Sequence, residues 1–266
     1  MRKSMNMHSQ HPPPIRTWIR FSILASLLLF AGACSTTPNA SEKSLMAQRN
    51  FQEAQGSGYV QEETFKKLKE AILLVPDEPM YRVALGNAYF KKLKLDKAER
   101  LYLSAIKVDP KYMGTYRQIS RLYMQKGQWD KAIYYLKRAL SEPNVIDPIQ
   151  LLNWMAYSHY RMGDLPKAEK AWLKALGIND NEQVRLNLAL AYKDANQLDL
   201  ARASLLKVLE MDPDLPAAHF ALGEIYYRYN KLAQAKKHFK KVVQLEPLSE
   251  QAKVSQKFLR TLTVKK

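Results

Sequence analysis

Residues 216–247 read PAAHFALGEIYYRYNKLAQAKKHFKKVVQLEP. Large and small side chains recur within this stretch at helical spacing, and the stretch ends on a proline: Leu222-Gly223, Tyr226, Ala235, Phe239 and Pro247. The same order and spacing occur earlier in the chain, at Leu85-Gly86, Tyr89, Ala98, Tyr102 and Pro110. A pattern that returns at a fixed period predicts a stack of similar units, each of which buries its apolar face against its neighbours.

The period divides the chain into six units, at 45–78, 79–112, 113–146, 149–181, 182–215 and 216–249. Position 8 of the units carries Gln52, Gly86, Ser120, Ala156, Ala189 and Gly223. Position 20 carries Thr64, Ala98, Ala132, Ala168, Ala201 and Ala235. We expect the two helices of each unit to cross closely at these mostly small residues. Between the crossing points, position 24 supplies large side chains that we expect to be buried: Leu68, Tyr102, Leu136, Trp172, Leu205 and Phe239.

This pattern resembles the tetratricopeptide repeat, a helix–turn–helix unit of about 34 residues. The resemblance implies an all-α fold, a right-handed superhelical solenoid of about six repeats over residues 45–247. The first unit carries Gln52 where a small residue is expected, and the joint at 141–150 is longer than the period allows. Residues 248–266 are expected to form a C-terminal capping helix and a basic tail. Three apolar residues of the helix are expected to cover the last repeat: Val254, Phe258 and Leu262.

The first 33 residues have the composition of a secretory signal peptide. A basic start precedes the apolar run FSILASLLLFAGA at 21–33, which is shorter than the roughly 20 residues that a membrane span needs. Residues 31–34, AGAC, resemble the bacterial lipobox, which implies lipid attachment at Cys34. By the same resemblance, Ser35 implies export to the outer membrane, facing the periplasm. An uncleaved signal anchor is the alternative. Residues 34–44 are small and polar and predict a flexible lipid-anchored linker.

The chain is basic, with 42 Lys and Arg against 25 Asp and Glu, a formal net charge of +17. A basic surface attracts nucleic acid, anionic lipid or an acidic partner, and it also keeps long helices solvated. No nucleic-acid-reading motif is present, and the export signal also argues against a nucleic-acid partner. The single cysteine excludes an intramolecular disulfide and a Cys-rich metal site.

No catalytic, cofactor or metal-binding pattern emerges from the sequence. The histidines outside the signal segment lie at unrelated repeat positions, without the spacing of metal ligands: His159, His219 and His238. His159 takes a tyrosine position and is expected to pack, whereas His238 lies among lysines and is expected to be solvated. We therefore expect a non-catalytic protein without cofactor or metal.

The resemblance also implies a concave groove formed by the first helices of successive repeats, where an extended peptide or a helix binds. The groove positions of the template mix aromatic and arginine side chains, which often dominate interface energies. They are Val83, Asn87, Phe90, Lys91, Arg117, Arg121, Met124, Asn153, Tyr157, Tyr160, Arg161, Leu186, Leu190, Lys193, Phe220, Glu224, Tyr227 and Arg228.

The signal segment, the lipobox and the repeats together resemble the tetratricopeptide-repeat lipoproteins of type IV pilus biogenesis. In that family the protein helps the outer-membrane secretin to assemble. The resemblance implies a protein–protein interaction scaffold that is anchored at Cys34 and binds secretin or another envelope component. The alternative is a lipoprotein adaptor that recruits an envelope protease or a cell-wall enzyme. Association of two copies through the solenoid ends is also open.

Overall fold

The computed structural model describes residues 38–56, 61–143 and 145–264, and every regular element in these ranges is an α-helix. The predicted signal peptide at 1–33 and Cys34 lie outside the described residues, as do residues 265–266 of the basic tail.

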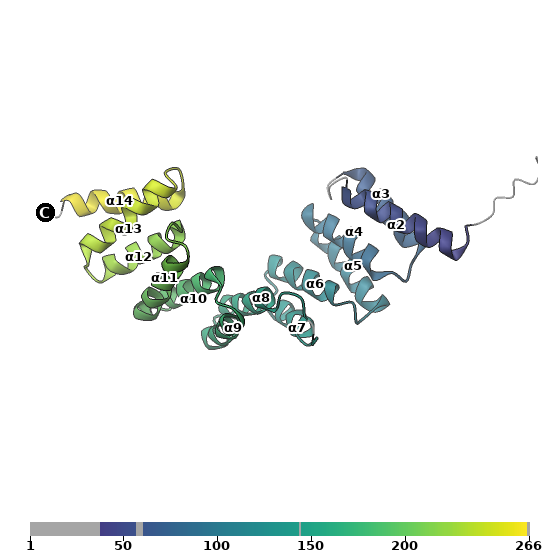
Figure 1. Ribbon diagram of the computed structural model, residues 1–266, viewed down its shortest axis with the longest axis horizontal. Coiled ribbons are helices and arrows are strands. Elements are labelled where there is room, and N and C mark those ends of the chain that lie inside the picture. Colours follow the sequence, from purple (N-terminus) through teal and green to yellow (C-terminus); the bar gives the residue numbers. More distant parts are fainter. Residues whose placement is uncertain (1–37, 57–60, 144, 265–266) are drawn as a thin grey trace, which may run out of the picture.

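Thirteen helices form in this part of the chain, and twelve of them pair as consecutive hairpins. They are α2 (Ala40–Gly56) with α3 (Glu62–Leu74), α4 (Pro79–Lys91) with α5 (Leu95–Val108), α6 (Met113–Gln125) with α7 (Trp129–Ala139), α8 (Pro148–Arg161) with α9 (Leu165–Ile178), α10 (Glu182–Asp194) with α11 (Leu198–Met211), and α12 (Pro216–Arg228) with α13 (Leu232–Leu245). A final helix, α14 (Glu250–Val264), packs on α13. The hairpins follow one another along an arc, with α6 and α8 on its inner side and α7 and α9 on its outer side (Figure 1). The expected all-α repeat solenoid is confirmed.

Each hairpin is held together where small residues let the two helices approach. All six residues of position 20 and all six large residues of position 24 are buried. Gly86 shows how tight the crossing is, since a Cβ added there would lie 2.5 Å from the ring of Tyr102. Gly223 faces Phe239 in the same way, at 2.7 Å. The alternation of small and large residues therefore determines the packing within each repeat, as expected.

The turns between paired helices share one backbone conformation. A residue with positive φ follows the first helix of five consecutive repeats: Leu93, Gly127, Gly163, Asn196 and Asn230. Glycine and asparagine tolerate this left-handed region, whereas leucine does so at a steric cost. Leu93 is also 71% exposed, so no burial compensates for its conformation.

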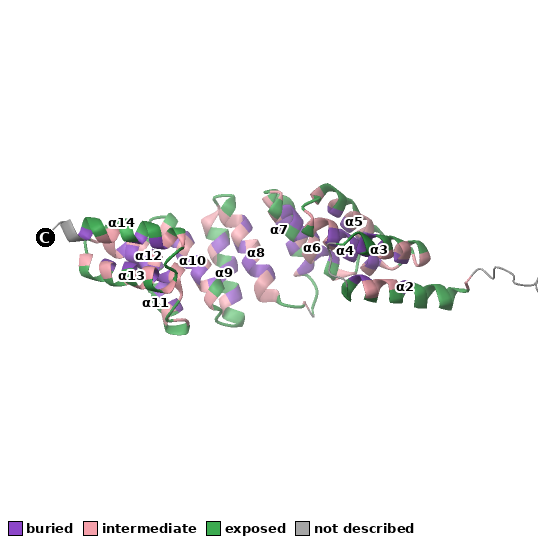
Figure 2. Cartoon of the chain, turned by 90° about the horizontal axis from the view of Figure 1, so that it is seen from above, coloured by how far each residue is buried: buried purple, intermediate pink, exposed green. Residues whose placement is uncertain are grey.

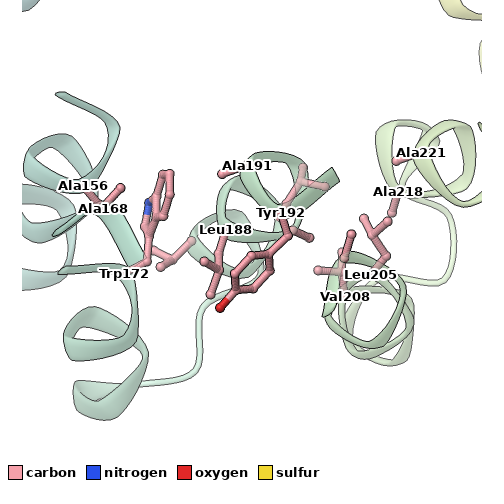
Figure 3. Close-up of a cluster of buried hydrophobic side chains, with 14 of the residues drawn as sticks. Ala156, Ala168, Trp172, Leu188, Ala191, Tyr192, Leu205, Val208, Ala218 and Ala221 are labelled. Carbon is pink, nitrogen blue, oxygen red and sulfur yellow. The ribbon is translucent and has the colours of Figure 1, made fainter. Parts of the chain in front are cut away.

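The core extends along the solenoid between neighbouring repeats, and exposed residues gather on the turns and outer faces (Figure 2). Its largest cluster joins the last three repeats. Figure 3 shows part of this cluster, with Trp172 from α9, Leu188 and Tyr192 from α10 and Leu205 from α11 directed into the space between helices. Each repeat thus depends on its neighbours for burial of its apolar surface.

Both ends of the solenoid differ in detail from the sequence-based expectation. Helix α2 begins at Ala40, so the last residues of the expected linker are helical. Gln52 is exposed, and Ala47 and Ala54 supply the buried small side chains of α2 instead. In α14 the ring of Phe258 stacks on Phe239 at 4.6 Å, and Leu262 is buried, as expected. The expectation for Val254 is wrong because its side chain is exposed.

Candidate partner-binding groove

A hollow of about 370 Å³ lies where α6, the start of α7 and α8 meet. It is lined by Arg121, Met124, Gln125, Trp129, Trp154, Tyr157 and Arg161. Four of these residues were expected in the groove, from two different repeats, and the fold brings them to one place. We call this feature the central hollow.

Aromatic rings fix the two arginines of the central hollow. The guanidinium carbon of Arg161 lies 4.7 Å from the ring centroid of Trp129, and its Nη1 donates a 3.0 Å hydrogen bond to the hydroxyl of Tyr157. Trp129 and Tyr157 are themselves in edge-to-face contact, with centroids 5.9 Å apart. Arg121 lies 4.7 Å from the ring of Phe90, on the preceding repeat. These cation–π contacts position both guanidinium groups without neutralising them.

Arg117, a third arginine near this region, has a carboxylate partner. Arg117 forms a 2.9 Å ion pair with Asp147, at the extended joint before α8, and lies 5.7 Å from the ring of Trp154. It also lines a second, mainly apolar hollow of about 250 Å³ beside that joint. In contrast, neither Arg121 nor Arg161 has an ion-pair partner within 38–56, 61–143 and 145–264.

Several residues that the template assigns to the groove support its wall instead of lining it. Val83, Asn153 and Leu186 are buried, so their assignment to the groove surface is corrected. Asn87 accepts a 2.7 Å hydrogen bond from the hydroxyl of Tyr102. Asn153 accepts one of 2.8 Å from Nε1 of Trp172. These contacts hold the two helices of a repeat together.

Most side chains at the groove positions of the last two repeats make contacts with other residues of the solenoid. Lys193 and Glu224 form an ion pair of 2.6 Å across two repeats. Tyr227 contacts the ring of Phe258 on α14 at 5.0 Å, and Phe220 packs in the same cluster. Among the remaining positions, Tyr160 donates a 2.5 Å hydrogen bond to Asp194, Leu190 packs half-buried against the core, and Lys91 and Arg228 are exposed.

Three residues of the central hollow were missed by the sequence reading. Gln125 occupies position 13, one of the groove positions, and the same template could have found it. Trp129 begins the second helix of its repeat, and Trp154 lies one position after a groove residue. The template assigns neither of them to the groove, so only the packing of α7 against α8 reveals their role.

The region around His238 differs from the expectation of a solvated side chain. Its Nδ1 lies 2.9 Å from Nδ1 of His219, and its ring stacks on Tyr226 with centroids 5.4 Å apart. His219 Nε2 lies 2.9 Å from the carbonyl oxygen of Pro213. Burial lowers the pKa of His238 to about 4, and the neighbouring His219 and Lys237 add to this effect.

Two further properties of the described residues concern metal binding and membrane spanning. No group of three or more His, Cys, Asp or Glu residues in them is arranged to hold a metal ion. None of the described helices is both long and apolar enough to cross a membrane.

Comparisons with known proteins agree with the repeat architecture. Tetratricopeptide-repeat family models match residues 83–148, 189–230 and 216–249. Residues 83–148 and 189–249 therefore consist of tetratricopeptide repeats. The chain is 24% identical over 163 residues to the Hsp70-Hsp90 organising protein of Plasmodium falciparum. This matched segment is 59% of this chain and 28% of that protein. The chain spans about a quarter of the length of the curated relatives it matches.

Two solved structures share the fold. PilF of Pseudomonas aeruginosa matches with a TM-score of 0.65 and 14% identity, covering 83% of this chain and 99% of PilF. PilW, described as a type IV pilus biogenesis factor, matches with a TM-score of 0.70 and 16% identity, covering 80% of this chain and 98% of PilW. At these identities the likeness is one of fold.

Proposed function

We propose that this protein is a non-catalytic scaffold that binds a segment of a protein partner in the central hollow. Tetratricopeptide repeats indicate protein–protein interaction. The observation that carries the proposal is the concentration, at α6–α8, of aromatic rings and of two arginines that have no carboxylate partner among the described residues. Aromatic and arginine side chains in a preformed hollow supply most of the binding energy of many interfaces. Because Phe90, Trp129 and Tyr157 hold the arginines in place, little side-chain entropy is lost when a partner binds.

We further propose that the scaffold is exported, lipid-anchored at Cys34 and held at the outer membrane, facing the periplasm. There it assists the assembly of an envelope complex such as the type IV pilus and its secretin. The lipobox-like sequence at 31–34 supports the anchor. The shared fold, which extends over 98–99% of PilF and PilW and 80–83% of this chain, supports the pilus assignment.

Site-specific photo-crosslinking in cells tests the groove. A photo-reactive amino acid is placed at Gln125, which is exposed and lines the central hollow, and in a matched variant at Leu173, which is exposed on α9. We expect a discrete crosslinked partner from position 125 and not from position 173. Secretin or pilus components among the products support the pilus assignment. A protease or a cell-wall enzyme in their place supports the adaptor alternative. Equal products from both positions contradict a groove-bound partner.

The anchor is tested by Cys34→Ala in the full chain. We expect the wild-type protein to carry the added mass of acyl chains and to fractionate with membranes, since each buried CH₂ contributes about 0.8 kcal/mol. The variant should lose both properties. Equal mass and equal fractionation of the two proteins would contradict lipid attachment.

A further inference from the structure

We propose that the central hollow selects a partner segment in which an acidic side chain stands next to an aromatic or other large apolar side chain. Arg121 and Arg161 bind the carboxylate, and the rings of the hollow receive the apolar neighbour. This inference rests on the proposed function and specifies the chemistry of the partner.

The first argument is the imbalance of charge at the hollow. Two other cations are neutralised from within the fold: Lys126, directly after α6, contacts Asp96 and Glu99 at 2.7 and 2.6 Å, and Lys193 on α10 contacts Glu224. Arg121 and Arg161 line one hollow without a carboxylate from any described residue. Two like charges in one concave site attract an anionic group and disfavour a cationic one.

The second argument is the supply of N–H donors. A guanidinium group has five N–H donors, and an electrostatic contact with an aromatic ring does not require an N–H···O hydrogen bond from them. Arg161 uses one such donor on the hydroxyl of Tyr157, and Arg121 contacts the ring of Phe90. Arginine recognises carboxylates through paired N–H···O hydrogen bonds, which are stronger than neutral ones. The two arginines next to the rings therefore keep N–H donors for such a ligand.

The third argument is the apolar part of the lining. Met124, Trp154 and Tyr157 are each half-buried, so they offer apolar surface to the hollow while they remain fixed in the fold. A volume of about 370 Å³ is within the range of sites that take compact ligand groups. A carboxylate alone would leave this apolar surface in water. An acidic residue with a large apolar neighbour satisfies both parts of the lining.

Selection from a peptide library tests the inference. The library is random in sequence and blocked at both termini, so that side chains supply the only carboxylates. It is selected in parallel on the full chain in mild detergent and on the double variant Arg121→Gln/Arg161→Gln. We expect peptides selected on the wild-type chain to be enriched in Asp or Glu beside an aromatic residue. The double variant should lose this enrichment.

The affinity of one selected peptide for the wild-type chain and for its variants then measures the contribution of each arginine. Each single Arg→Gln substitution should weaken binding about tenfold, as should exchange of the peptide's acidic residue for its amide. Combining the amide peptide with the double variant should cause little further loss, since both changes remove the same contacts. Arg100→Gln, an exposed site on α5 outside the hollow, is the matched control and should leave the affinity unchanged.

A blocking variant separates failure of this inference from failure of the proposed function. Gln125→Trp places a bulky side chain at the exposed rim of the hollow, and preserved helical circular dichroism verifies its fold. Peptides that this variant no longer binds, but that show no acidic preference, overturn the inference and leave the groove function standing. Acidic peptides that bind equally well after loss of both arginines also overturn it. If no selected peptide is sensitive to Gln125→Trp, both proposals fail.

Discussion

The indole Nε1 of Trp172 donates a hydrogen bond of 2.8 Å to Oδ1 of Asn153, in the buried interior of one repeat. Nδ2 of Asn187, on the next repeat, donates to the same oxygen at 3.0 Å. One amide oxygen thus joins α8, α9 and α10. Since buried polar groups need partners, this network links the packing within a repeat to the packing between repeats.

Replacement of Asn153 by alanine should lower the free energy of unfolding by about 1–3 kcal/mol, because the indole N–H of Trp172 would lose its partner. Urea unfolding followed by circular dichroism and tryptophan fluorescence measures the change. Asn187→Ala is the matched control, with a smaller expected loss because Asn187 is only half-buried. Equal losses in the two variants would contradict a special role for Asn153.

Leu93→Gly should stabilise the protein by about 1 kcal/mol, since leucine in the left-handed conformation is strained and glycine is not. Thermal unfolding provides the comparison. Gly163→Ala, at the equivalent turn of another repeat, introduces the strain and should destabilise. An unchanged or lower melting temperature for Leu93→Gly would show that its turn is not strained.

Gly223→Ala should destabilise by about 1–3 kcal/mol, because the new Cβ would lie 2.7 Å from the ring of Phe239. Gly177→Ala on α9 is the control, since no atom of a neighbouring element lies within 4 Å of a Cβ at that position. There the higher helix propensity of alanine should stabilise by roughly 0.5–1 kcal/mol. Denaturant midpoints of the two variants should therefore move in opposite directions, and a shift in the same direction would contradict the close crossing.

The ion pair of Lys193 and Glu224 should show a favourable coupling in a double-mutant cycle. Their side chains are only 16% and 24% exposed, so either single charge reversal leaves like charges close together. We expect each of Lys193→Glu and Glu224→Lys to destabilise by about 1 kcal/mol. The double exchange should restore most of this loss. Additive losses in the double variant would mean that the pair contributes no coupling.

The free energy of unfolding should decrease as the pH is lowered from about 6.5 to about 4, the range in which His238 is still neutral in the folded protein. Because burial holds its pKa at about 4, the folded state does not take up the proton that unfolded His238 binds below about 6.5. The free energy of unfolding is therefore fully retained above about pH 6.5 and decreases towards pH 4. Unfolding titrations across this interval measure the slope.

His238→Gln should reduce that slope without removing it. Burial also lowers the pKa of His159, which contributes in the same direction. His159→Gln should therefore give a second, separate reduction. If the free energy of unfolding of His238→Gln depends on pH as steeply as that of the wild-type protein, the effect of burial on His238 is contradicted.

Much of the fold could be predicted from spacing alone. Gly86 and Tyr102, or Gly223 and Phe239, stand at fixed positions because a close helix crossing needs a small residue opposite a large one. This requirement is local in sequence and recurs in each unit, so residue volume at a known period is enough to predict the hairpins. The same reasoning was less successful in the first and last helices, where Ala47 and Ala54 are the buried small residues in place of Gln52, and Val254 is exposed.

The binding surface depends on contacts between repeats, which spacing does not determine. By itself the sequence determined the repeat units, their buried residues and the helices that form the inner side of the arc. Only the tertiary structure showed that Asn153 is buried by Trp172, that Lys193 is neutralised by Glu224, and that Trp129 joins Arg161. The physical reason is that packing within a repeat depends on the volumes of side chains close together in the sequence. Which arginines lack a carboxylate partner and which rings stay exposed depend on the side chains that meet across separate repeats.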